Sequence, residues 1–294
     1  MVKHSTTGSV DEFRRSWKQA SETRRYHFSR HAPQHQVQFA FQNHWRVFSD
    51  VLKGTRLERV LEVGSGRGSM GAFFANHGCE THLLDTSYDV LISAQMLFAA
   101  DGLSCRCSNG DSLRLPYAEG AFDSIFSIGL LEHFEDIRAP LLEQLRVLRP
   151  GGMMLCYVVP ENFFSVQLLA APVNLALRFG YFVYTLLRGR KWKRPPAKPP
   201  LYRNSYTSRE YFKILAEAGV SEMGAFGMYP LPLVSHSPAF PFSPMTPGLE
   251  KVLMGCWRML LGLRRRLLRR DPWTCHEHWG LAFLVWARKP GGPA

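Results

Sequence analysis

The sequence predicts an α/β fold built on a mostly parallel β-sheet with helices on both faces. Residues 57–160 alternate short apolar strand patterns with helical patterns, as strand–helix units of a parallel sheet do. In the first unit, an apolar run at 60–63 leads directly into a glycine-rich turn at 64–68 and then into a helical pattern at 69–77. The chain has 294 residues, of which 46% are hydrophobic, so it can bury one sizeable core plus additions.

The glycine-rich turn predicts a site for a nucleotide-like ligand. Glycines at alternate positions let the backbone turn sharply and approach a ligand, and the amides of the following helix would point at the same place. A dinucleotide fingerprint starting at Gly64 would need glycine at position 69, where Ser69 stands; the match formed by Gly66, Gly68 and Gly71 starts two residues late. The Glu62 carboxylate would face a pyrophosphate. It suits instead the amino group and positive sulfur of S-adenosylmethionine.

Four motifs follow one another along this region. They are VLEVGSGRG at 60–68, THLLD at 81–85, NGDSLRLPY at 109–117, and FDSIFSIGLLEH at 122–133 followed by VLRPGG at 147–152. The acid that ends the second motif stands about 20 residues past the turn, where an acceptor for ribose hydroxyls belongs. Together the motifs resemble the class I S-adenosylmethionine-dependent methyltransferases, of the methyltransferase type 11 group that includes the ubiquinone-pathway methyltransferases.

The resemblance implies a fold and a set of cofactor-binding residues. The fold is a Rossmann-like sheet of seven strands, mostly parallel, with the last strand inserted antiparallel beside the sixth. Asp85 would accept hydrogen bonds from both ribose hydroxyls, and Asp111 from the adenine amino group. The expected cofactor-binding residues are Glu62, Gly64, Ser65, Gly66, Gly68, Asp85, Thr86, Asp111, Ser112, Ser127, Ile128, Gly129 and Tyr26. For the three acids, a structural role such as capping a helix is the alternative.

His133 is the predicted catalytic residue, because imidazole titrates near neutrality and the residue follows the fourth strand. A base is needed only if the methyl acceptor must lose a proton. In some related O-methyltransferases the same region reads Glu-x-x-Glu-His and binds a metal. Here Gly129 takes the first position, which leaves Glu132 and His133, so no metal is expected.

Two other groups of potential ligands are weak candidates. His27, His31 and His35 recur every fourth residue, but Pro33 interrupts the helix that would align them. Residues 275–278 (CHEH) are too closely spaced for a standard zinc site, and His276 and His278 would share one strand face bordering the substrate pocket. Cys105 and Cys107 are expected in the core.

The chain divides into a standard core and additions. We expect a helical N-terminal cap at 1–56, the cofactor-binding core at 57–160, an insertion at 161–206, a core helix and strand at 207–229, a second insertion at 230–278, and the last strand with a tail at 279–294. The cap presents an apolar face of Phe39, Trp45, Val47, Phe48, Val51 and Leu52. Ser208 is the predicted N-cap of a helix ending at Gly219, and strands are expected at 225–229 and 280–288.

The first insertion combines an apolar run at 163–187 with a basic cluster of Arg188, Arg190, Lys191, Lys193 and Arg194. Gln167, Asn174 and Arg178 interrupt the run, and Pro172 is expected to break a helix. These residues argue against a membrane span and favour a lid or an element lying at a membrane interface. A helical hairpin that covers an ordinary pocket is the alternative.

The second insertion repeats this combination. A proline-rich loop at 230–247 precedes a helix with Leu253, Trp257, Leu260 and Leu261 on one side. Leucines then alternate with a second basic cluster: Arg264, Arg265, Arg266, Arg269 and Arg270. This pattern is typical of an amphipathic helix on anionic lipid, with a solvated basic face as the alternative.

The net charge of the chain indicates which kinds of partner it attracts. The formal charge of +12 implies attraction to an anionic partner, which could be a membrane, nucleic acid or an acidic substrate. The basic clusters adjoin apolar stretches, which favours membrane over nucleic acid. Six irregularly spaced cysteines without a secretory signal indicate a cytoplasmic protein. The two insertions together favour peripheral association with a membrane. The expected function is S-adenosylmethionine-dependent methylation of a small apolar or lipid-linked acceptor at a membrane surface. The alternatives are methylation of a soluble small molecule or RNA, and a non-catalytic scaffold.

Overall fold

The computed structural model describes residues 27–161, 165–189, 202–234 and 245–291. Tyr26 and the basic residues 190–194 therefore lie outside the described residues, as does part of the proline-rich loop.

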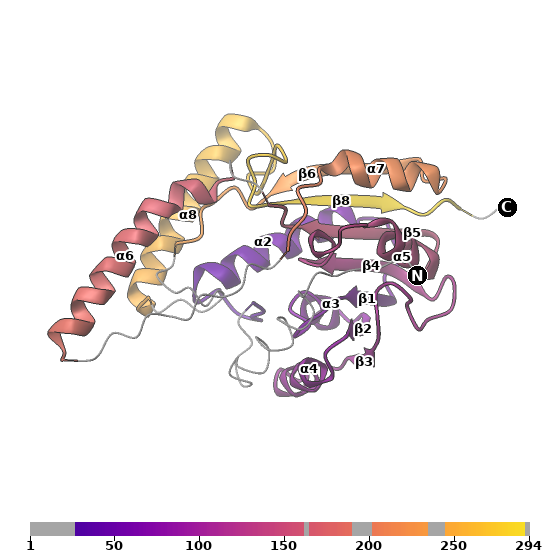
Figure 1. The fold of residues 1–294 in the computed structure, drawn as a ribbon, viewed down its shortest axis with the longest axis horizontal. Helices are drawn as coiled ribbons and strands as arrows, with labels where there is room; N and C mark the ends of the chain where they lie inside the picture. Colours follow the sequence, from indigo (N-terminus) through magenta and orange to yellow (C-terminus); the bar gives the residue numbers. More distant parts are fainter. Residues whose placement is uncertain (1–26, 162–164, 190–201, 235–244, 292–294) are drawn as a thin grey trace.

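An eight-stranded sheet organises these residues, in the order β3-β2-β1-β4-β5-β8-β6-β7 (Figure 1). Its strands are β1 (Arg59–Val63), β2 (Glu80–Asp85), β3 (Arg106–Asn109), β4 (Phe122–Ile128), β5 (Leu148–Val158), β6 (Glu222–Met228), β7 (Thr274–Cys275) and β8 (Ala282–Arg288). The first five strands pair in parallel, and β8 runs antiparallel between β5 and β6. The predicted parallel sheet with an antiparallel last strand is confirmed. The two-residue β7 adds an eighth strand at the edge.

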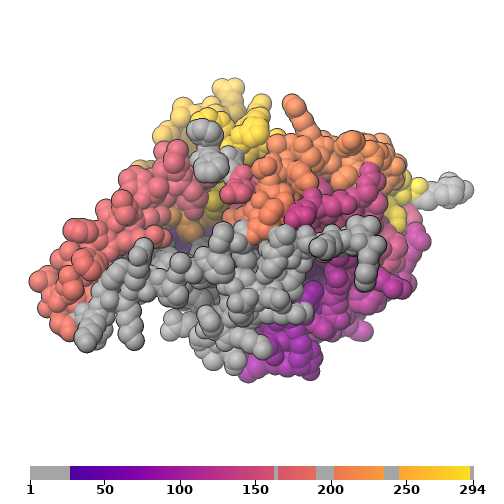
Figure 2. Space-filling view, viewed as in Figure 1, coloured from indigo at the N-terminus to yellow at the C-terminus, as the bar shows by residue number. Residues whose placement is uncertain are grey.

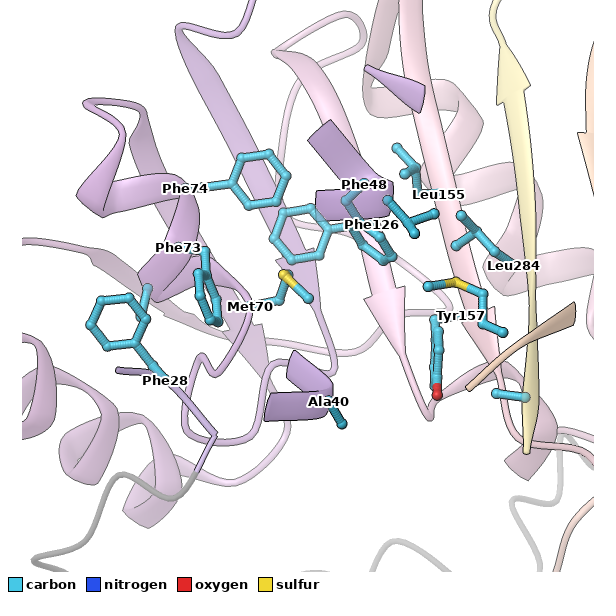
Figure 3. Packing of buried hydrophobic residues seen from close by; sticks show 14 of the residues in the cluster. Phe28, Ala40, Phe48, Met70, Phe73, Phe74, Phe126, Leu155, Tyr157 and Leu284 are labelled. Atoms are coloured by element: carbon cyan, nitrogen blue, oxygen red, sulfur yellow. The ribbon is translucent and has the colours of Figure 1, made fainter. Parts of the chain in front are cut away.

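Helices cover both faces, as predicted. One core contains side chains of α2 (Gln36–Val51), α3 (Gly71–Asn76), α4 (Tyr88–Ala100) and α8 (Pro247–Leu268). The other contains side chains of α5 (Arg138–Val147) and α7 (Ser208–Glu217). In the first core, the rings of Phe74 from α3 and Phe126 from β4 stack with centroids 4.6 Å apart (Figure 3).

The apolar face predicted for the N-terminal cap lies on α2. Phe39, Val47, Phe48 and Leu52 are buried, and Trp45 and Val51 pack half-buried against the same core. Cys105 and Cys107 also pack half-buried against this core, with their sulfurs 3.8 Å apart.

Several local predictions were wrong in detail. Thr207, not Ser208, is the N-cap of α7, because its backbone N–H and its hydroxyl both donate to the Glu210 carboxylate, at 2.8 and 2.7 Å. Strand β6 begins three residues earlier than expected and ends before Tyr229, whose φ of 61° lies in the left-handed region. His276 and His278 lie in a turn after β7, not on a strand.

The two insertions form long helices that extend beyond the sheet on the same side of the view in Figure 1. Pro172 does not break the first of them: α6 (Gln167–Leu187) continues through it. On α8, Leu261 is buried and Trp257 half-buried as expected, but Leu260 is exposed, so the predicted apolar face is rotated. No helix within the described residues has the length and apolar character needed to cross a bilayer.

Candidate functional site

The glycine-rich turn lies between β1 and α3, where the strand order reverses direction between β1 and β4. Ligands of open α/β sheets bind at such a reversal, beyond the carboxyl ends of the strands. Gly64, Gly66 and Gly68 have φ of 66°, 51° and 65°, in the left-handed region that favours glycine. At Gly68 a Cβ would also lie 2.7 Å from a methyl group of Leu83. The Ser65 N–H donates to the Leu84 carbonyl at 2.9 Å, which ties the turn to β2.

Glu62, on β1, is buried beneath this turn. Its Oε2 accepts a hydrogen bond from the Gly71 N–H, the first residue of α3, at 2.8 Å. The carboxylate therefore binds a helix N-terminus, which is the structural alternative foreseen for it. A role in orienting the cofactor stays a prediction.

Asp85 ends β2 and reaches the turn. Its two carboxylate oxygens accept hydrogen bonds from the Gly66 N–H at 2.9 Å and the Ser87 N–H at 2.8 Å. These two amides fix the carboxylate at the mouth of the turn. Thr86 follows it and is half-buried.

The loop after β3 lies beside Asp85. The Gly110 N–H and the Asn109 side-chain amide both donate to the Asp85 backbone carbonyl, at 3.1 and 3.0 Å. Asp111 is exposed, and its Oδ1 accepts from the Leu113 N–H at 2.9 Å; Ser112 is buried. The two acids predicted to bind the ribose and the adenine thus stand on adjacent strand ends.

The end of β4 completes this edge. Ser127 pairs with Val63, the last residue of β1, so both strands end at the same level. Gly129 leaves the strand with φ of 66°, and its N–H donates to the Tyr157 carbonyl at 2.9 Å. Ile128 and Gly129 are half-buried.

A group such as S-adenosylmethionine fits this set of residues. The Ser65 hydroxyl is buried in the turn and has no hydrogen-bond partner among the described residues. A backbone-lined turn, a fixed carboxylate and an unsatisfied hydroxyl are the donors and acceptors that a polar nucleoside needs.

A short 3-10 helix, η1 (Leu131–His133), carries the residues predicted for catalysis. His133 is buried, and its Nδ1 donates to the Tyr202 carbonyl at 2.7 Å, which leaves Nε2 as the nitrogen that accepts a proton. Burial lowers the pKa of His133, so the ring is neutral at pH 7. Asn204 fixes η1: its side-chain amide donates to the carbonyls of Leu131 and Phe134, at 3.0 and 2.9 Å.

Glu132 is the most unusual residue of η1. It is 1% exposed, and burial raises its pKa to about 7. Its Oε1 lies 3.5 Å from where a Cβ on Gly129 would stand, and its Oε2 has no hydrogen-bond partner in the described part of the chain. A carboxyl group that can be protonated near neutral pH therefore adjoins the end of β4.

A buried aromatic cluster lies below the end of β5. His44 accepts from the Trp273 indole N–H through Nδ1 at 3.0 Å, so its Nε2 carries the proton and donates to the Tyr157 hydroxyl at 3.4 Å. Burial lowers the pKa of His44 to about 3 and raises that of Tyr157 well above 10. Figure 3 shows the Tyr157 hydroxyl directed past the end of the strand. Sequence reasoning missed this cluster and Asn204, because nothing local marks them.

The histidine triplet does not lie on one helix. Residues 27–35 are irregular: His27 Nδ1 lies 2.8 Å from the Ser69 hydroxyl, and the His35 side chain accepts from Gln38 at the start of α2. The predicted cofactor contact of Tyr26 lies outside the described residues, although its neighbour His27 adjoins the glycine-rich turn. Among the described residues, no three His, Cys, Asp or Glu side chains are arranged to hold a metal ion.

The chain is similar to known methyltransferases. Residues 61–156 match the family model described as a methyltransferase domain. A malonyl-acyl-carrier-protein O-methyltransferase of Enterobacter lignolyticus is 31% identical over 35% of this chain and 39% of its own length. A demethylmenaquinone methyltransferase of Tropheryma whipplei is 31% identical over 46% of this chain and 55% of its own length. A protein of Bos taurus named probable tRNA methyltransferase 9B is 31% identical over 40% of this chain and 26% of its own length.

The chain thus spans about two fifths to half of the bacterial relatives, so their activities do not transfer to it directly. Solved structures agree on the fold. The cyclase SpnF is similar over 97% of this chain and 94% of its own, with a TM-score of 0.53 and 17% identity. A geranyl diphosphate methyltransferase in complex with S-adenosylmethionine is similar over 86% of this chain and 87% of its own, with a TM-score of 0.52 and 13% identity. The predicted family resemblance is confirmed.

Proposed function

We propose that this chain, which carries a class I S-adenosylmethionine-dependent methyltransferase domain at residues 61–156, methylates a small apolar or lipid-linked acceptor at a membrane surface. The observation that supports methyl transfer most strongly is the edge formed by β1, β2 and β4. There the Asp85 carboxylate, the glycine-rich turn and the buried Ser65 hydroxyl meet at the reversal of strand order.

Each part of this edge has a proposed task. Asp85 and Thr86 would hold the ribose, Asp111 and Ser112 the adenine, and the turn from Gly64 to Gly68 the methionine part, with Ser127–Gly129 beneath. When bound, S-adenosylmethionine supplies a methyl group already activated by the positive sulfur. The chain then needs only to align the acceptor and keep water out. His133, whose Nδ1 donates to the Tyr202 carbonyl, is the proposed base.

The apolar acceptor is inferred from the two insertions. Both helices that extend from the sheet, α6 and α8, expose large apolar side chains beside basic ones. Such a surface would bring the enzyme to substrates dissolved in or anchored to a bilayer. The names of the relatives from Enterobacter and Tropheryma include acceptors carried on a protein or on a quinone ring, which are compatible with this class. We propose a cytoplasmic enzyme associated peripherally with a membrane.

A soluble acceptor or RNA is the second candidate. The charge of +12 and the similarity to the Bos taurus protein favour it. A scaffold without methyl transfer is a third candidate, because a shared fold does not fix the reaction and one similar structure is a cyclase. The intact set of residues on the cofactor edge argues against the scaffold.

Methyl-labelled S-adenosylmethionine tests these candidates together. The purified protein is incubated with an extract of cells lacking its gene, and the products are separated into organic, aqueous, RNA and protein fractions. We expect label in the organic fraction, and none with Asp85→Ala. Label confined to the aqueous or RNA fraction would replace the apolar acceptor by the second candidate, and cofactor binding without any transfer would favour the scaffold.

Loss of cofactor affinity in Asp85→Ala is the first specific prediction. Removing two charge-assisted acceptors should weaken S-adenosylmethionine binding roughly a hundredfold in calorimetry. Asp85 also binds Gly66 and Ser87, so the thermal unfolding of the variant is measured in parallel. Glu119→Ala, which removes a carboxylate that is 77% exposed, is the matched control and should bind normally. Unchanged affinity in Asp85→Ala would contradict the assignment of the site.

A further inference from the structure

Helix α6 is almost entirely exposed. Of its 21 residues, only Ala170 is buried, and Figure 2 shows the helix reaching past the body of the molecule. Its exposed apolar side chains recur at helical spacing along one face. Leu168, Leu175, Phe179, Val183 and Leu186 form this face, and Leu169, Val173, Tyr181, Tyr184 and Leu187 are exposed around the rest of the helix. Arg178 is the single charged residue of the helix, so this face offers water few polar groups to hydrate.

Helix α8 has two apolar faces. Met254 and Leu261 are buried on the inner face, in the core that also contains α2. The outer face of an ordinary surface helix would be polar. On α8 seven large apolar side chains are exposed, and five of them recur at helical spacing on the outer face: Leu249, Val252, Met259, Leu263 and Leu267. Two of them, Met259 and Leu267, are 74% and 72% exposed.

Positive charge surrounds these apolar faces. Arg265, Arg266, Arg269 and Arg270 are all exposed at the end of α8, and Arg188 follows α6. Glu250 is the single acidic residue of the two helices, and it is buried. Any partner of this surface must therefore accept apolar side chains and carry negative charge at the same time.

We infer that α6 and the outer face of α8 form a docking surface for an anionic lipid bilayer, with both helices lying in the headgroup layer. A bilayer offers an apolar interior directly below anionic phosphates, and arginine side chains reach those phosphates while leucines enter the acyl region. Two other partners fit less well. A second copy of this chain would bring the same arginines together, and nucleic acid would match the charge but leave the apolar faces in water.

This inference rests on the proposed function, for which it names the partner. It also assigns the contact to the apolar side chains of α6 and α8 and the arginines beside them, and it does not include residues 190–194, which lie outside the described residues. With both helices in the membrane plane, the inference expects the sheet to lie beside the bilayer, so that an acceptor reaches it without leaving the lipid.

Vesicle flotation tests the docking surface. The full chain is mixed with vesicles of phosphatidylcholine alone or with about 30% phosphatidylglycerol, at low salt and at about 0.5 M salt. We expect binding to the anionic vesicles that weakens with salt. Phe179→Glu combined with Leu263→Glu and Leu267→Glu should reduce partitioning more than tenfold, because each change removes an apolar side chain and adds repulsion. Arg266→Glu with Arg270→Glu should do the same at low salt only.

A matched control lies on α4. Met96 is 59% exposed and far from both helices in sequence, so Met96→Glu should leave vesicle binding unchanged. Equal loss in this control, or no binding of the native chain to anionic vesicles, would overturn the inference. So would light scattering that shows a dimer dissociated by the α6 and α8 substitutions, since the surface would then join two copies.

The two proposals can fail separately. Cofactor affinity and label transfer in detergent-dispersed extract do not need a bilayer. If label still reaches the organic fraction while flotation shows no docking, the docking surface is wrong and methylation of an apolar acceptor stands. If binding to anionic vesicles is normal but no cofactor binds, methyl transfer is wrong instead.

Discussion

Two buried ionisable residues near the ends of β4 and β5 should give the protein a characteristic pH dependence. Burial raises the pKa of Glu132 to about 7 and lowers that of His44 to about 3. A raised carboxyl pKa favours the folded state at low pH, whereas a lowered imidazole pKa favours it at high pH. The folded protein therefore keeps Glu132 protonated and His44 neutral together between pH values of about 3 and about 7.

The Glu132→Gln substitution should remove the part of this pH dependence that comes from Glu132. The contribution of Glu132 is fully present below its unfolded pKa of 4.5 and is lost as pH rises to about 7. Between pH 5 and pH 8, the free energy of unfolding of the native chain should therefore fall by about 2 to 3 kcal/mol relative to the variant. Urea titrations at both pH values measure this, with Glu119→Gln as the exposed control. Parallel pH profiles of native chain and variant would contradict it.

For individual helices, strands and turns, sequence patterns were informative only where the residues that determine the structure are close together in the sequence. The turn after β1 was predictable, because its glycines, the strand before it and the helix after it are contiguous in sequence. The start of α7 was missed by one residue, because both Thr207 and Ser208 can cap a helix and only the position of the Glu210 side chain decides between them.

Contacts distant in sequence could not be predicted. His44 and Trp273 are 229 residues apart, and the imidazole–indole hydrogen bond exists only because the core containing α2 brings them together. Pro172 was wrongly expected to end a helix. A proline inside a helix removes one backbone hydrogen bond and introduces a steric clash, but the other hydrogen bonds of a long helix can offset this cost. Glu132 carried no sign in the sequence that its carboxyl group would be buried.

Asn204, in the segment that returns from the first insertion, donates from its side chain to two carbonyls of η1 and from its backbone to the Glu132 carbonyl. Asn204→Ala removes the side-chain donor from both carbonyls, although the Leu131 carbonyl keeps the Phe134 N–H at 3.3 Å. The substitution should lower the free energy of unfolding by about 2 to 4 kcal/mol. Hydrogen exchange at 131–134 should accelerate as well.

Asn43→Ala is the control for this substitution. The Asn43 side chain, unlike that of Asn204, donates to only one backbone carbonyl, that of Phe39, on the partly exposed side of α2. Its loss should cost less than about 1 kcal/mol in the same urea titration, because the carbonyl lies within a helix. Similar losses in both variants would mean that Asn204 has no special part in fixing η1.

At the scale of the whole molecule, the strand order makes the end of the sequence central to the sheet. Strand β8 lies between β5 and β6, and residues 283–288 pair with both. Residues of β8 enter both cores: Leu284 packs on one face, and Phe283 and Val285 on the other. The α7–β6 unit is joined to the parallel half of the sheet through β8, so this strand should be required for cooperative folding.

Truncation tests this directly. A chain ending at residue 279 lacks β8 and should lose its cooperative thermal transition, because the edge of β5 and two hydrophobic cores are opened at once. A chain ending at residue 290 keeps β8 and Lys289, whose ammonium group donates to the carbonyls of Arg146 and Leu148 at 3.1 and 2.8 Å, and should unfold like the native protein. If the shorter chain still unfolds cooperatively and binds S-adenosylmethionine, the parallel half of the sheet is an independent folding unit. In that case the additions around β8 would be separable from cofactor binding, and only acceptor transfer would need the complete sheet.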